Sequence, residues 1–186
     1  MLASGSPRRR ELLDMIGLKD FIVIPADIEE RIPQGMSPAP AVCGIALQKA
    51  EYVARFCNIC DTIIAADTLV YLDERALGKP QSPDEAAAML RELSGRRHTV
   101  YTGVALYKGG KNITGAERTD VFFRNISDTE ICEYIKTGEP LDKAGAYGAQ
   151  GLGAVFIERI EGDFFNVMGL PLCRLSMMLK DFGVMI

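Results

Sequence analysis

The sequence predicts a mixed α/β fold, and three features of its patterning lead to this class. Short runs of apolar and β-branched residues, such as TIIAA at 62–66, are typical of strands buried on both faces of a sheet. Segments with helical spacing of apolar residues lie between such runs, and serine or proline stands at the start of several of them. The predicted strands and helices do not alternate in strict βαβ order, which favours a mixed architecture over a repeated parallel one.

The elements of the first half follow from caps, breakers and apolar periodicity. After a short N-terminal strand and a turn of small residues, Ser6 and Pro7 are the N-cap and first position of a helix that ends at Gly17. The next predicted elements are a short buried strand at 21–25, a loop at 26–40, an alanine-rich helix at about 41–56, and a central strand at 62–66 that ends at Asp67 and Thr68.

The elements of the second half follow from similar signals. Residues 69–72 either continue the central strand or pair as a strand beside it, and a helix at 84–93 is opened by Ser82 and Pro83. Two segments rich in β-branched and aromatic residues, 99–107 and 113–124, flank a glycine-containing turn and predict a β-hairpin. The remaining predicted elements are a helix at about 128–137, closing strands at 151–160 and 164–168, and a final helix at about 172–182.

Length and composition predict a globular, cytoplasmic chain. The 186 residues fit one domain, and a hydrophobic content of 48% is enough for a sizeable core. No apolar run approaches the roughly 20 residues of a membrane span, and the N-terminus lacks the features of a signal peptide, so we expect no membrane partner. The 5 cysteines have no regular spacing and predict free thiols in a reducing compartment rather than a disulfide framework.

The acidic balance of the chain limits its partners. A net charge of −4 and a pI near 5.1 argue against broad binding to nucleic acid, which requires a basic surface. A small phosphorylated ligand needs only a local cluster of positive charge, for which the candidates are Arg8, Arg9, Lys49 and Lys79.

The first predicted helix has the features of a phosphate-binding cradle. Ser4 and Ser6 lie in the turn that precedes it, and the start of the helix presents unpaired N–H groups and the positive end of the helix dipole. Arg8 and Arg9 add guanidinium groups beside those N–H groups. The alternative is an ordinary capped helix with solvated arginines.

Asp67 is the strongest candidate for chemistry, because a carboxylate directly after a buried strand stands where α/β sheets place their ligands. Hydrolysis of a phosphoanhydride needs a carboxylate to hold Mg²⁺ or to orient and deprotonate water. Glu29 and Glu30 could supply a second carboxylate, and Glu30 is the preferred one. A strand-end turn for Asp67 and a solvated loop for the glutamates are the alternatives.

Other reactive residue types favour structural roles. Lys49 and Lys79 could hold phosphate oxygens, although lysines are more often solvated surface charges. His98 stands at a strand start and is expected to be a structural imidazole. Cys57 and Cys60 have C-x-x-C spacing without a second pair, which favours buried thiols over a zinc or redox site.

Several motifs stand in order along the chain. They are SGSPRR at 4–9, AADT at 65–68, GKP at 78–80, SG at 94–95 with His98, EPLDKAGAYG at 139–148 and VMGLP at 167–171. In this combination the chain resembles the Maf family of nucleoside triphosphate pyrophosphatases. The AYGAQG segment at 146–151 is similar to the branch that prefers dTTP and UTP over methylated guanine nucleotides.

The resemblance implies an ITPase-like (Maf/Ham1-type) α/β architecture, with an elongated mixed central sheet flanked by helices and a cleft between two lobes, in a single Maf-like domain over residues 1–186. It also implies a cytoplasmic homodimer. In the implied reaction a divalent cation, Mg²⁺ or Mn²⁺, binds the triphosphate, and water attacks the α-phosphorus to release nucleoside monophosphate and pyrophosphate. Such an enzyme limits the incorporation of non-standard nucleotides.

The resemblance also assigns roles to individual residues. Asp67 corresponds to the proton acceptor, and Glu30 is the metal-side carboxylate beside it. The phosphate-binding set, which includes the two serines of the cradle, is Ser4, Ser6, Arg9, Lys49 and Lys79. The positions that tune the choice of base are Arg8, Thr68 and Gln150, whose polar groups can hydrogen-bond a pyrimidine edge.

Two alternatives to a dTTP and UTP pyrophosphatase stay open from the sequence. One is a pyrophosphatase selective for another base, because base choice depends on a few side chains. The other is a nucleotide-binding regulator of septum formation during cell division, which would bind nucleotide without significant turnover.

Overall fold

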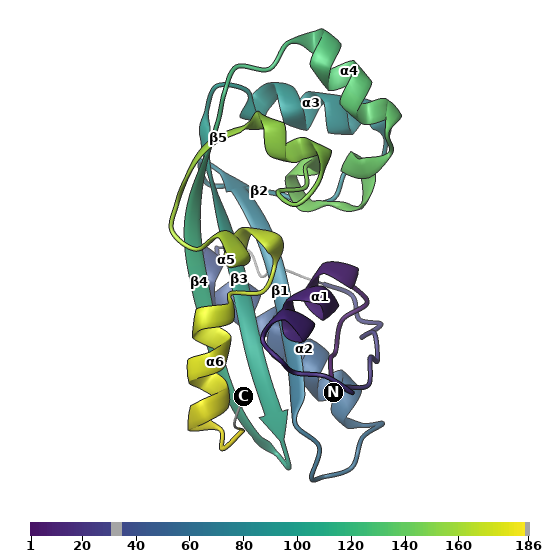
Figure 1. The fold of residues 1–186 in the computed structure, drawn as a ribbon, viewed down its shortest axis with the longest axis vertical. Coiled ribbons are helices and arrows are strands. Elements are labelled where there is room, and N and C mark those ends of the chain that lie inside the picture. Colours follow the sequence, from purple (N-terminus) through teal and green to yellow (C-terminus); the bar gives the residue numbers. More distant parts are fainter. Residues whose placement is uncertain (31–34, 185–186) are drawn as a thin grey trace. The chain divides into compact units, whose positions relative to one another are not determined.

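The computed structural model describes residues 1–30 and 35–184 of the chain (Figure 1). Its helices are α1 (Pro7–Met15), α2 (Pro38–Ala54), α3 (Pro83–Leu93), α4 (Asp128–Lys136), α5 (Phe164–Met168) and α6 (Leu172–Asp181). Its strands are β1 (Ile63–Leu72), β2 (Arg75–Leu77), β3 (Arg97–Lys108), β4 (Lys111–Phe123) and β5 (Ile157–Glu161). Short 3₁₀ helices lie at η1 (Glu139–Asp142), η2 (Ala144–Ala146) and η3 (Leu152–Phe156).

The strands form one sheet in the order β2-β1-β3-β4-β5. β1 and β2 pair antiparallel with Val70 opposite Leu77, and β4 and β5 pair antiparallel with Val121 opposite Ile160. β3 and β4 form the predicted hairpin, and its tight turn is made by Gly109 and Gly110. Both glycines have positive φ, 56° and 83°, which such a turn requires and side chains disfavour. The mixed α/β class predicted from the sequence is confirmed.

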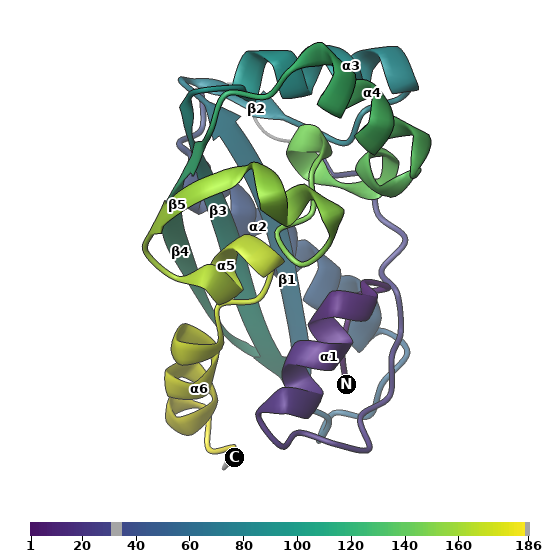
Figure 2. The ribbon, with the colours of Figure 1, turned by 45° about the horizontal axis from the view of Figure 1, so that its top comes forward.

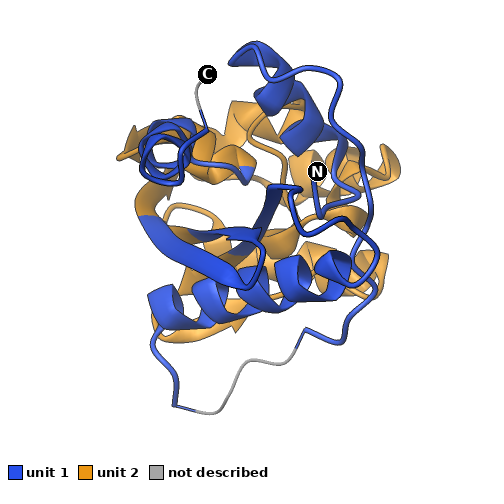
Figure 3. Ribbon diagram, turned by 90° about the horizontal axis from the view of Figure 1, so that it is seen from below, with its two compact units in different colours: residues 1–68, 102–117, 169–186 blue, residues 69–101, 118–168 orange. Residues whose placement is uncertain are grey.

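Contacts divide the chain into two compact units (Figure 3). Unit 1 comprises residues 1–68, 102–117 and 169–186, and unit 2 comprises residues 69–101 and 118–168. The long strands β1, β3 and β4 contribute residues to both units. The single domain over residues 1–186 and the cleft between lobes stay predictions.

The core of unit 1 forms where α2 packs on β1 and β3. Ala46 and Ala50 of α2 contact Ala65 of β1 and Ala105 of β3 in one buried cluster. Small side chains let the helix approach the sheet closely, and Gly103 makes the closest approach. A Cβ at Gly103 would lie 2.4 Å from the backbone of Val42, so any larger residue there would push α2 off the sheet.

The N-terminal strand is reduced to a single pairing residue. Leu2 forms parallel bridges with both Val23 and Ile64, and its side chain is fully buried. The chain of residues 1–3 therefore lies against the start of β1, and the turn that leads to α1 begins from a fixed position.

The core of unit 2 lies between α3, α4 and the strands of that unit. Leu90 of α3 and Ile131 of α4 are buried with Val121 and Phe123 of β4. α3 and α4 lie side by side in both Figure 1 and Figure 2. Ser82 caps α3 by accepting from Glu85 N at 3.1 Å, as expected from the sequence.

The helices predicted at the start of the chain, at 41–56, 84–93, 128–137 and 172–182, are confirmed within one turn of their predicted bounds. The loop predicted at 26–40 includes residues 31–34, which lie outside the described residues. Within the described residues no helix is both long and apolar enough to cross a membrane.

Three predictions near the strands are wrong. Residues 21–25 form no buried strand, because only Val23 pairs and Ile22 is 60% exposed. Residues 164–168 form helix α5, which begins after Asp163, whose carboxylate accepts from Phe165 N at 2.8 Å. Residues 152–156 are the 3₁₀ helix η3, and β5 begins only at Ile157. A local side-chain cap thus outweighed the β-propensity of the apolar residues that follow it.

All five cysteines are free. Cys57 is partly buried and Cys60 is exposed, so the prediction of buried thiols at this pair is wrong for Cys60. Cys60 lies in the short loop between α2 and β1, where its side chain is exposed.

His98 is enclosed by aromatic side chains at the start of β3. Its Nε2 lies 2.8 Å from the Tyr147 hydroxyl, and its ring makes edge contacts with Phe123 and Tyr147. The side chain is 1% exposed, and this burial lowers the pKa of the imidazole to about 4. These contacts are those of a structural imidazole.

We expect the stability of the protein to fall as the pH is lowered from 6.5 towards 4, because the unfolded chain then binds a proton that buried His98 does not. The slope from this group is up to about 1.4 kcal/mol per pH unit. Thermal unfolding of the wild type and of His98→Gln across this range measures it. Carboxylates titrate in both proteins, so the difference between the two pH dependences of stability reports on the chain's single histidine. Equal pH dependences in the wild type and His98→Gln would contradict the expectation.

Candidate active site

The sequence predicted Asp67 at the end of the central strand, but in the structure it lies inside β1. β1 continues through Thr68 to Leu72, so the alternative in which residues 69–72 extend the central strand is confirmed. Asp67 is 4% exposed. A carboxylate in the middle of a buried strand requires a charged or hydrogen-bonding partner, and its partner comes from α2.

Lys49 connects the two candidate carboxylates of unit 1. Its Nζ lies 2.7 Å from Asp67 Oδ1 and 2.6 Å from Glu30 Oε1. The Lys49 and Asp67 side chains are 10% and 5% exposed, whereas Glu30 is 51% exposed. We call these three residues the ion triad. The core-facing neighbours of Lys49 on α2 bury its stem, so its ammonium is brought to Asp67 in the interior of unit 1.

The second carboxylate oxygen of Asp67 is available within the triad. Asp67 Oδ2 is buried and has no hydrogen-bond partner among residues 1–30 and 35–184. Buried polar atoms of native proteins are almost always paired, and those that are not commonly serve binding or catalysis. Asp67 therefore presents one oxygen fixed by Lys49 and one oxygen able to accept.

Arg9 is held by hydrogen bonds to three separate segments of unit 1. Its Nε donates to the Gly169 carbonyl at 2.8 Å, its Nη1 to Ser4 Oγ at 3.0 Å and its Nη2 to Thr68 Oγ1 at 3.1 Å. Burial lowers the pKa of Arg9 from its ordinary value, while the charges of Asp67 and Glu30 act to raise it. The guanidinium stays charged, since arginine does not deprotonate in proteins. Its position in the site is therefore fixed before any ligand binds.

The start of α1 has the arrangement expected of an anion-binding turn. Ser6 occupies the N-cap position and Pro7 the first helical position, as predicted. The Ser6 side chain makes no capping bond, so it does not satisfy the N–H groups of the first turn. Ser6 N donates to Ser4 Oγ at 3.3 Å, which also accepts from Arg9. Arg8 follows on the same helix and is partly buried.

The structure brings most of the candidate residues together in unit 1. Ser4, Arg9 and Thr68 share one hydrogen-bond network, and the carboxylates of Asp67 and Glu30 in the ion triad interact electrostatically with Arg9. Lys79 and Gln150 belong to unit 2. Lys79 is exposed in the loop that follows β2, and Gln150 is exposed in a turn of the segment between η2 and η3.

A sequence comparison with known protein families agrees with this arrangement. The family described as "Maf-like protein" matches residues 1–182. The chain belongs to the Maf family. The matched residues include both SGSPRR, which forms the turn and start of α1, and AADT, which forms the centre of β1.

Curated Maf relatives are similar over nearly the full length of the chain. A protein of Bacillus cytotoxicus named "dTTP/UTP pyrophosphatase" is 50% identical over 98% of this chain and 94% of its own length. Proteins of the same name from two strains of Bacillus cereus, G9842 and AH187, are 46% and 47% identical over 99% of this chain and 95% of their own. A nucleoside triphosphatase, or dITP/XTP pyrophosphatase, of Mycobacterium abscessus aligns with 97% of this chain and 96% of its own, with a TM-score of 0.45 and 15% identity.

Glu30 and Asp67 are the carboxylates of this Maf protein that could hold a divalent cation. Among the described residues, no three or more histidine, cysteine, aspartate or glutamate side chains are grouped to hold a metal. Mg²⁺, however, commonly takes one or two carboxylates and completes its shell with phosphates and water. Glu30 and Asp67 both contact the ammonium of Lys49, so two carboxylates lie close to each other in unit 1.

Two residues that hold the Maf site were missed in the sequence. Thr102 of β3 is fully buried, and its hydroxyl lies 2.9 Å from that of Thr68. Gly169 supplies the carbonyl that Arg9 binds, and its φ of 103° favours glycine. The position of Gly169 within VMGLP was a usable signal. Thr102 had none, because a threonine in a β-rich segment is unremarkable.

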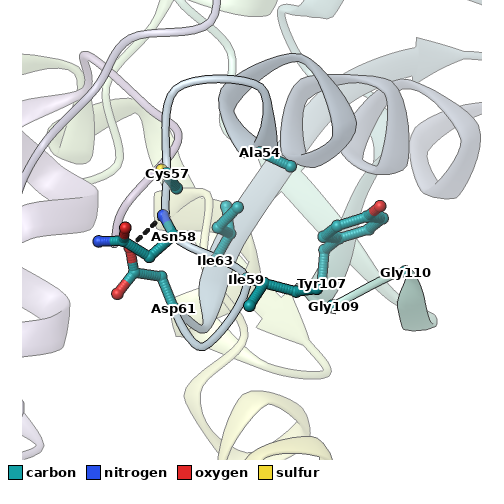
Figure 4. A pocket seen from close by; sticks show the side chains of 9 residues that line it. All are labelled: Ala54, Cys57, Asn58, Ile59, Asp61, Ile63, Tyr107, Gly109 and Gly110. Atoms are coloured by element: carbon teal, nitrogen blue, oxygen red, sulfur yellow. Dashed lines mark hydrogen bonds between the residues drawn. The ribbon is translucent and has the colours of Figure 1, made fainter.

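A separate pocket of about 240 Å³ lies in unit 1 between the end of α2 and the β3–β4 turn (Figure 4). Its walls include Cys57, Ile59 and Tyr107, and Asp61 accepts from Asn58 N at 2.8 Å within it. None of the candidate site residues lines it. It is therefore distinct from the ion triad.

Proposed function

We propose that this Maf protein hydrolyses dTTP and UTP to the nucleoside monophosphate and pyrophosphate, and so limits the incorporation of non-standard nucleotides. The observation that carries the proposal is Oδ2 of Asp67, which is buried and has no hydrogen-bond partner among residues 1–30 and 35–184, beside the charges of Lys49 and Arg9. The names of the curated relatives support the choice of substrates. They favour an enzyme over a regulator that binds nucleotide without turnover.

In this proposal Asp67 is the proton acceptor. Oδ1 is held by Lys49, which fixes the carboxylate, and Oδ2 accepts the proton of the attacking water. A carboxylate that is already oriented loses little entropy when it acts, so proton transfer needs only the water and the phosphorus to be placed correctly.

The phosphates are bound by the positive groups of the chain. Lys49 and Arg9, together with Ser4, Ser6 and the free N–H groups at the start of α1, provide donors within unit 1. Lys79 of unit 2 is assigned to the phosphates on the family motif alone. We likewise assign Arg8, Thr68 and Gln150 to recognition of the base.

Glu30 and Asp67 would hold the divalent cation, Mg²⁺ or Mn²⁺. When bound, the cation neutralises charge on the triphosphate and so lowers the repulsion that opposes the attack of water. Lys49 would then exchange part of its contact with the carboxylates for contact with phosphate oxygens. We also propose a cytoplasmic homodimer, for which the family resemblance is the support.

The test is pyrophosphate release from a panel of canonical and modified nucleoside triphosphates. We expect release to be strongest for dTTP and UTP with Mg²⁺ or Mn²⁺ and to be abolished by a chelator, then restored by added metal. Removing the metal leaves the carboxylates and the triphosphate mutually repulsive. Binding of nucleotide without release, in a folded protein supplied with metal, would contradict the proposed function and favour the regulator.

A further inference from the structure

The side chain of Glu139 forms hydrogen bonds to the backbone of the segment of unit 2 that contains Gln150. The two carboxylate oxygens of Glu139 accept from Leu152 N at 2.9 Å and from Gly153 N at 3.2 Å. Oε1 also accepts from the Tyr134 hydroxyl at 2.8 Å. The Glu139 side chain of η1 therefore accepts hydrogen bonds from the backbone N–H groups of Leu152 and Gly153, which follow Gln150 in the chain.

Tyr134 forms a hydrogen bond to the backbone of the same segment on the N-terminal side of Gln150. Its hydroxyl accepts from Gly148 N at 3.1 Å while it donates to Glu139. Tyr134 lies on α4, is 5% exposed and packs edge-on against Phe156. Gln150 thus lies between two backbone anchors, at Gly148 and at Leu152, which both lead to one hydrogen-bonded pair of side chains.

The glycines of this segment provide clearance for that pair. A Cβ at Gly148 would lie 2.8 Å from Glu139 Oε1, and a Cβ at Gly151 would lie 2.6 Å from the same atom. A Cβ at Gly153 would lie 2.6 Å from the Tyr134 hydroxyl. These contacts are too short for a carbon atom, so a side chain at 148, 151 or 153 would displace Glu139 or Tyr134 from the positions that their hydrogen bonds need.

The charge state of the pair suits this fastening. Burial acts to raise the pKa of Glu139, but hydrogen bonds from Leu152, Tyr134 and Gly153 outweigh it and lower the pKa. Burial and the adjacent Glu139 carboxylate raise the pKa of Tyr134. Near neutral pH the pair is therefore a carboxylate that only accepts and a phenol that donates to it, which is the combination that the contacts require.

We propose that Tyr134 and Glu139 are positioning residues that set the base preference of the site through Gln150. The inference rests on the proposed function, since it takes Gln150 as a contact to the base. Neither residue needs to touch the nucleotide. They fix the backbone on both sides of Gln150, and an amide that is held in place discriminates between hydrogen-bonding patterns better than one that can rearrange.

The test compares Tyr134→Phe and Glu139→Gln with Glu133→Gln as the matched control. Tyr134→Phe keeps the packed ring, and Glu139→Gln keeps the shape of the side chain but turns one acceptor into a donor. Glu133 is 65% exposed on α4 and pairs with the exposed Lys136, so its change should leave activity unaltered. The readouts are kcat and KM for dTTP, UTP and dCTP, and amide hydrogen exchange across residues 146–154.

We expect the ratio of kcat/KM for dTTP over dCTP to fall about tenfold in Tyr134→Phe and Glu139→Gln, chiefly through KM for dTTP, with faster exchange at 146–154. In a Gln150→Ala background the same two changes should alter the ratio no further. The inference would be overturned if Tyr134→Phe or Glu139→Gln lowered the dTTP-to-dCTP ratio further in the Gln150→Ala protein. It would also be overturned if neither Tyr134→Phe nor Glu139→Gln alone changed that ratio.

The two proposals fail in different ways. Wild-type protein without turnover on any nucleotide overturns the proposed function. Wild-type turnover of dTTP and UTP, with the ratio unchanged in a folded Tyr134→Phe, overturns only the positioning role. If Glu139→Gln does not fold, Tyr134→Phe alone decides, because it removes both anchoring contacts of one hydroxyl and leaves the buried ring.

Discussion

Asp67→Asn is expected to lower kcat for dTTP by roughly 10² to 10⁴-fold while nucleotide still binds. The asparagine side chain has nearly the shape of aspartate, but its amide cannot take a proton from water at neutral pH. In the wild type, Lys49 holds Oδ1, and Oδ2 has no partner among the described residues. The substitution therefore removes the ability of the side chain to accept a proton at the position of Oδ2. Steady-state pyrophosphate release and equilibrium nucleotide binding measure the two quantities separately.

Asp61→Asn is the matched control for this change. Asp61 lies before β1 in the same unit, where it accepts from Asn58 N at 2.8 Å, and asparagine can accept the same bond. Its kcat should equal that of the wild type. Turnover of Asp67→Asn within a few-fold of the wild type would remove Asp67 from the chemical step.

Lys49→Met is expected to destabilise the protein by about 3 to 5 kcal/mol, which is the usual loss when one partner of a buried ion pair is removed. Methionine preserves the apolar stem of the Lys49 side chain, so the change isolates the charge. Without the ammonium, Asp67 at 5% exposure keeps a buried negative charge, and Glu30 is left beside it with the same sign. The midpoint of thermal unfolding should fall by roughly 6 to 20 °C.

Two further variants define the cause of that loss. Lys136→Met removes a lysine from the exposed pair with Glu133 and should cost about 1 kcal/mol or less. Lys49→Met combined with Asp67→Asn removes the buried charge together with its partner, so the double variant should be more stable than Lys49→Met alone. Equal loss in both proteins would show that packing around Lys49, and not its charge, stabilises unit 1.

Metal provides an independent readout of the same triad. If Glu30 and Asp67 hold a divalent cation, Mg²⁺ should raise the unfolding temperature of Lys49→Met more than that of the wild type. In the wild type the ammonium already neutralises part of the carboxylate charge. An equal rise in both proteins would place the binding of Mg²⁺ elsewhere.

The starts of α1 and α3 were predictable because a cap involves only residues within one turn of the chain. Ser6 and Ser82 stand immediately before α1 and α3, and Pro7 and Pro83 are the first residues of these helices. The turn at 109–110 was equally visible, because paired glycines are suited to positive φ. The candidate residues in SGSPRR and AADT followed from the resemblance of these segments to the Maf motifs.

Strand bounds were predicted less well, because burial and pairing depend on distant residues. The break expected at Asp67 would hold for an isolated carboxylate, but Lys49 neutralises it and β1 continues. The apolar run at 164–168 resembled a strand, yet it forms α5 after the cap at Asp163. In both cases a single polar contact changed the balance between helix, strand and turn.

The sequence by itself determined the mixed α/β class, the starts of α1 and α3, the hairpin and the membership of the Maf family, since each depends on residues close in the chain or on ordered motifs. Only the tertiary structure decided what the charges do. It joined Lys49 to Asp67 across 18 residues and Arg9 to Gly169 across 160, and it placed Glu139 under the glycines around Gln150. A charge is stable in the interior only beside a partner, and folding alone determines which distant segment supplies that partner.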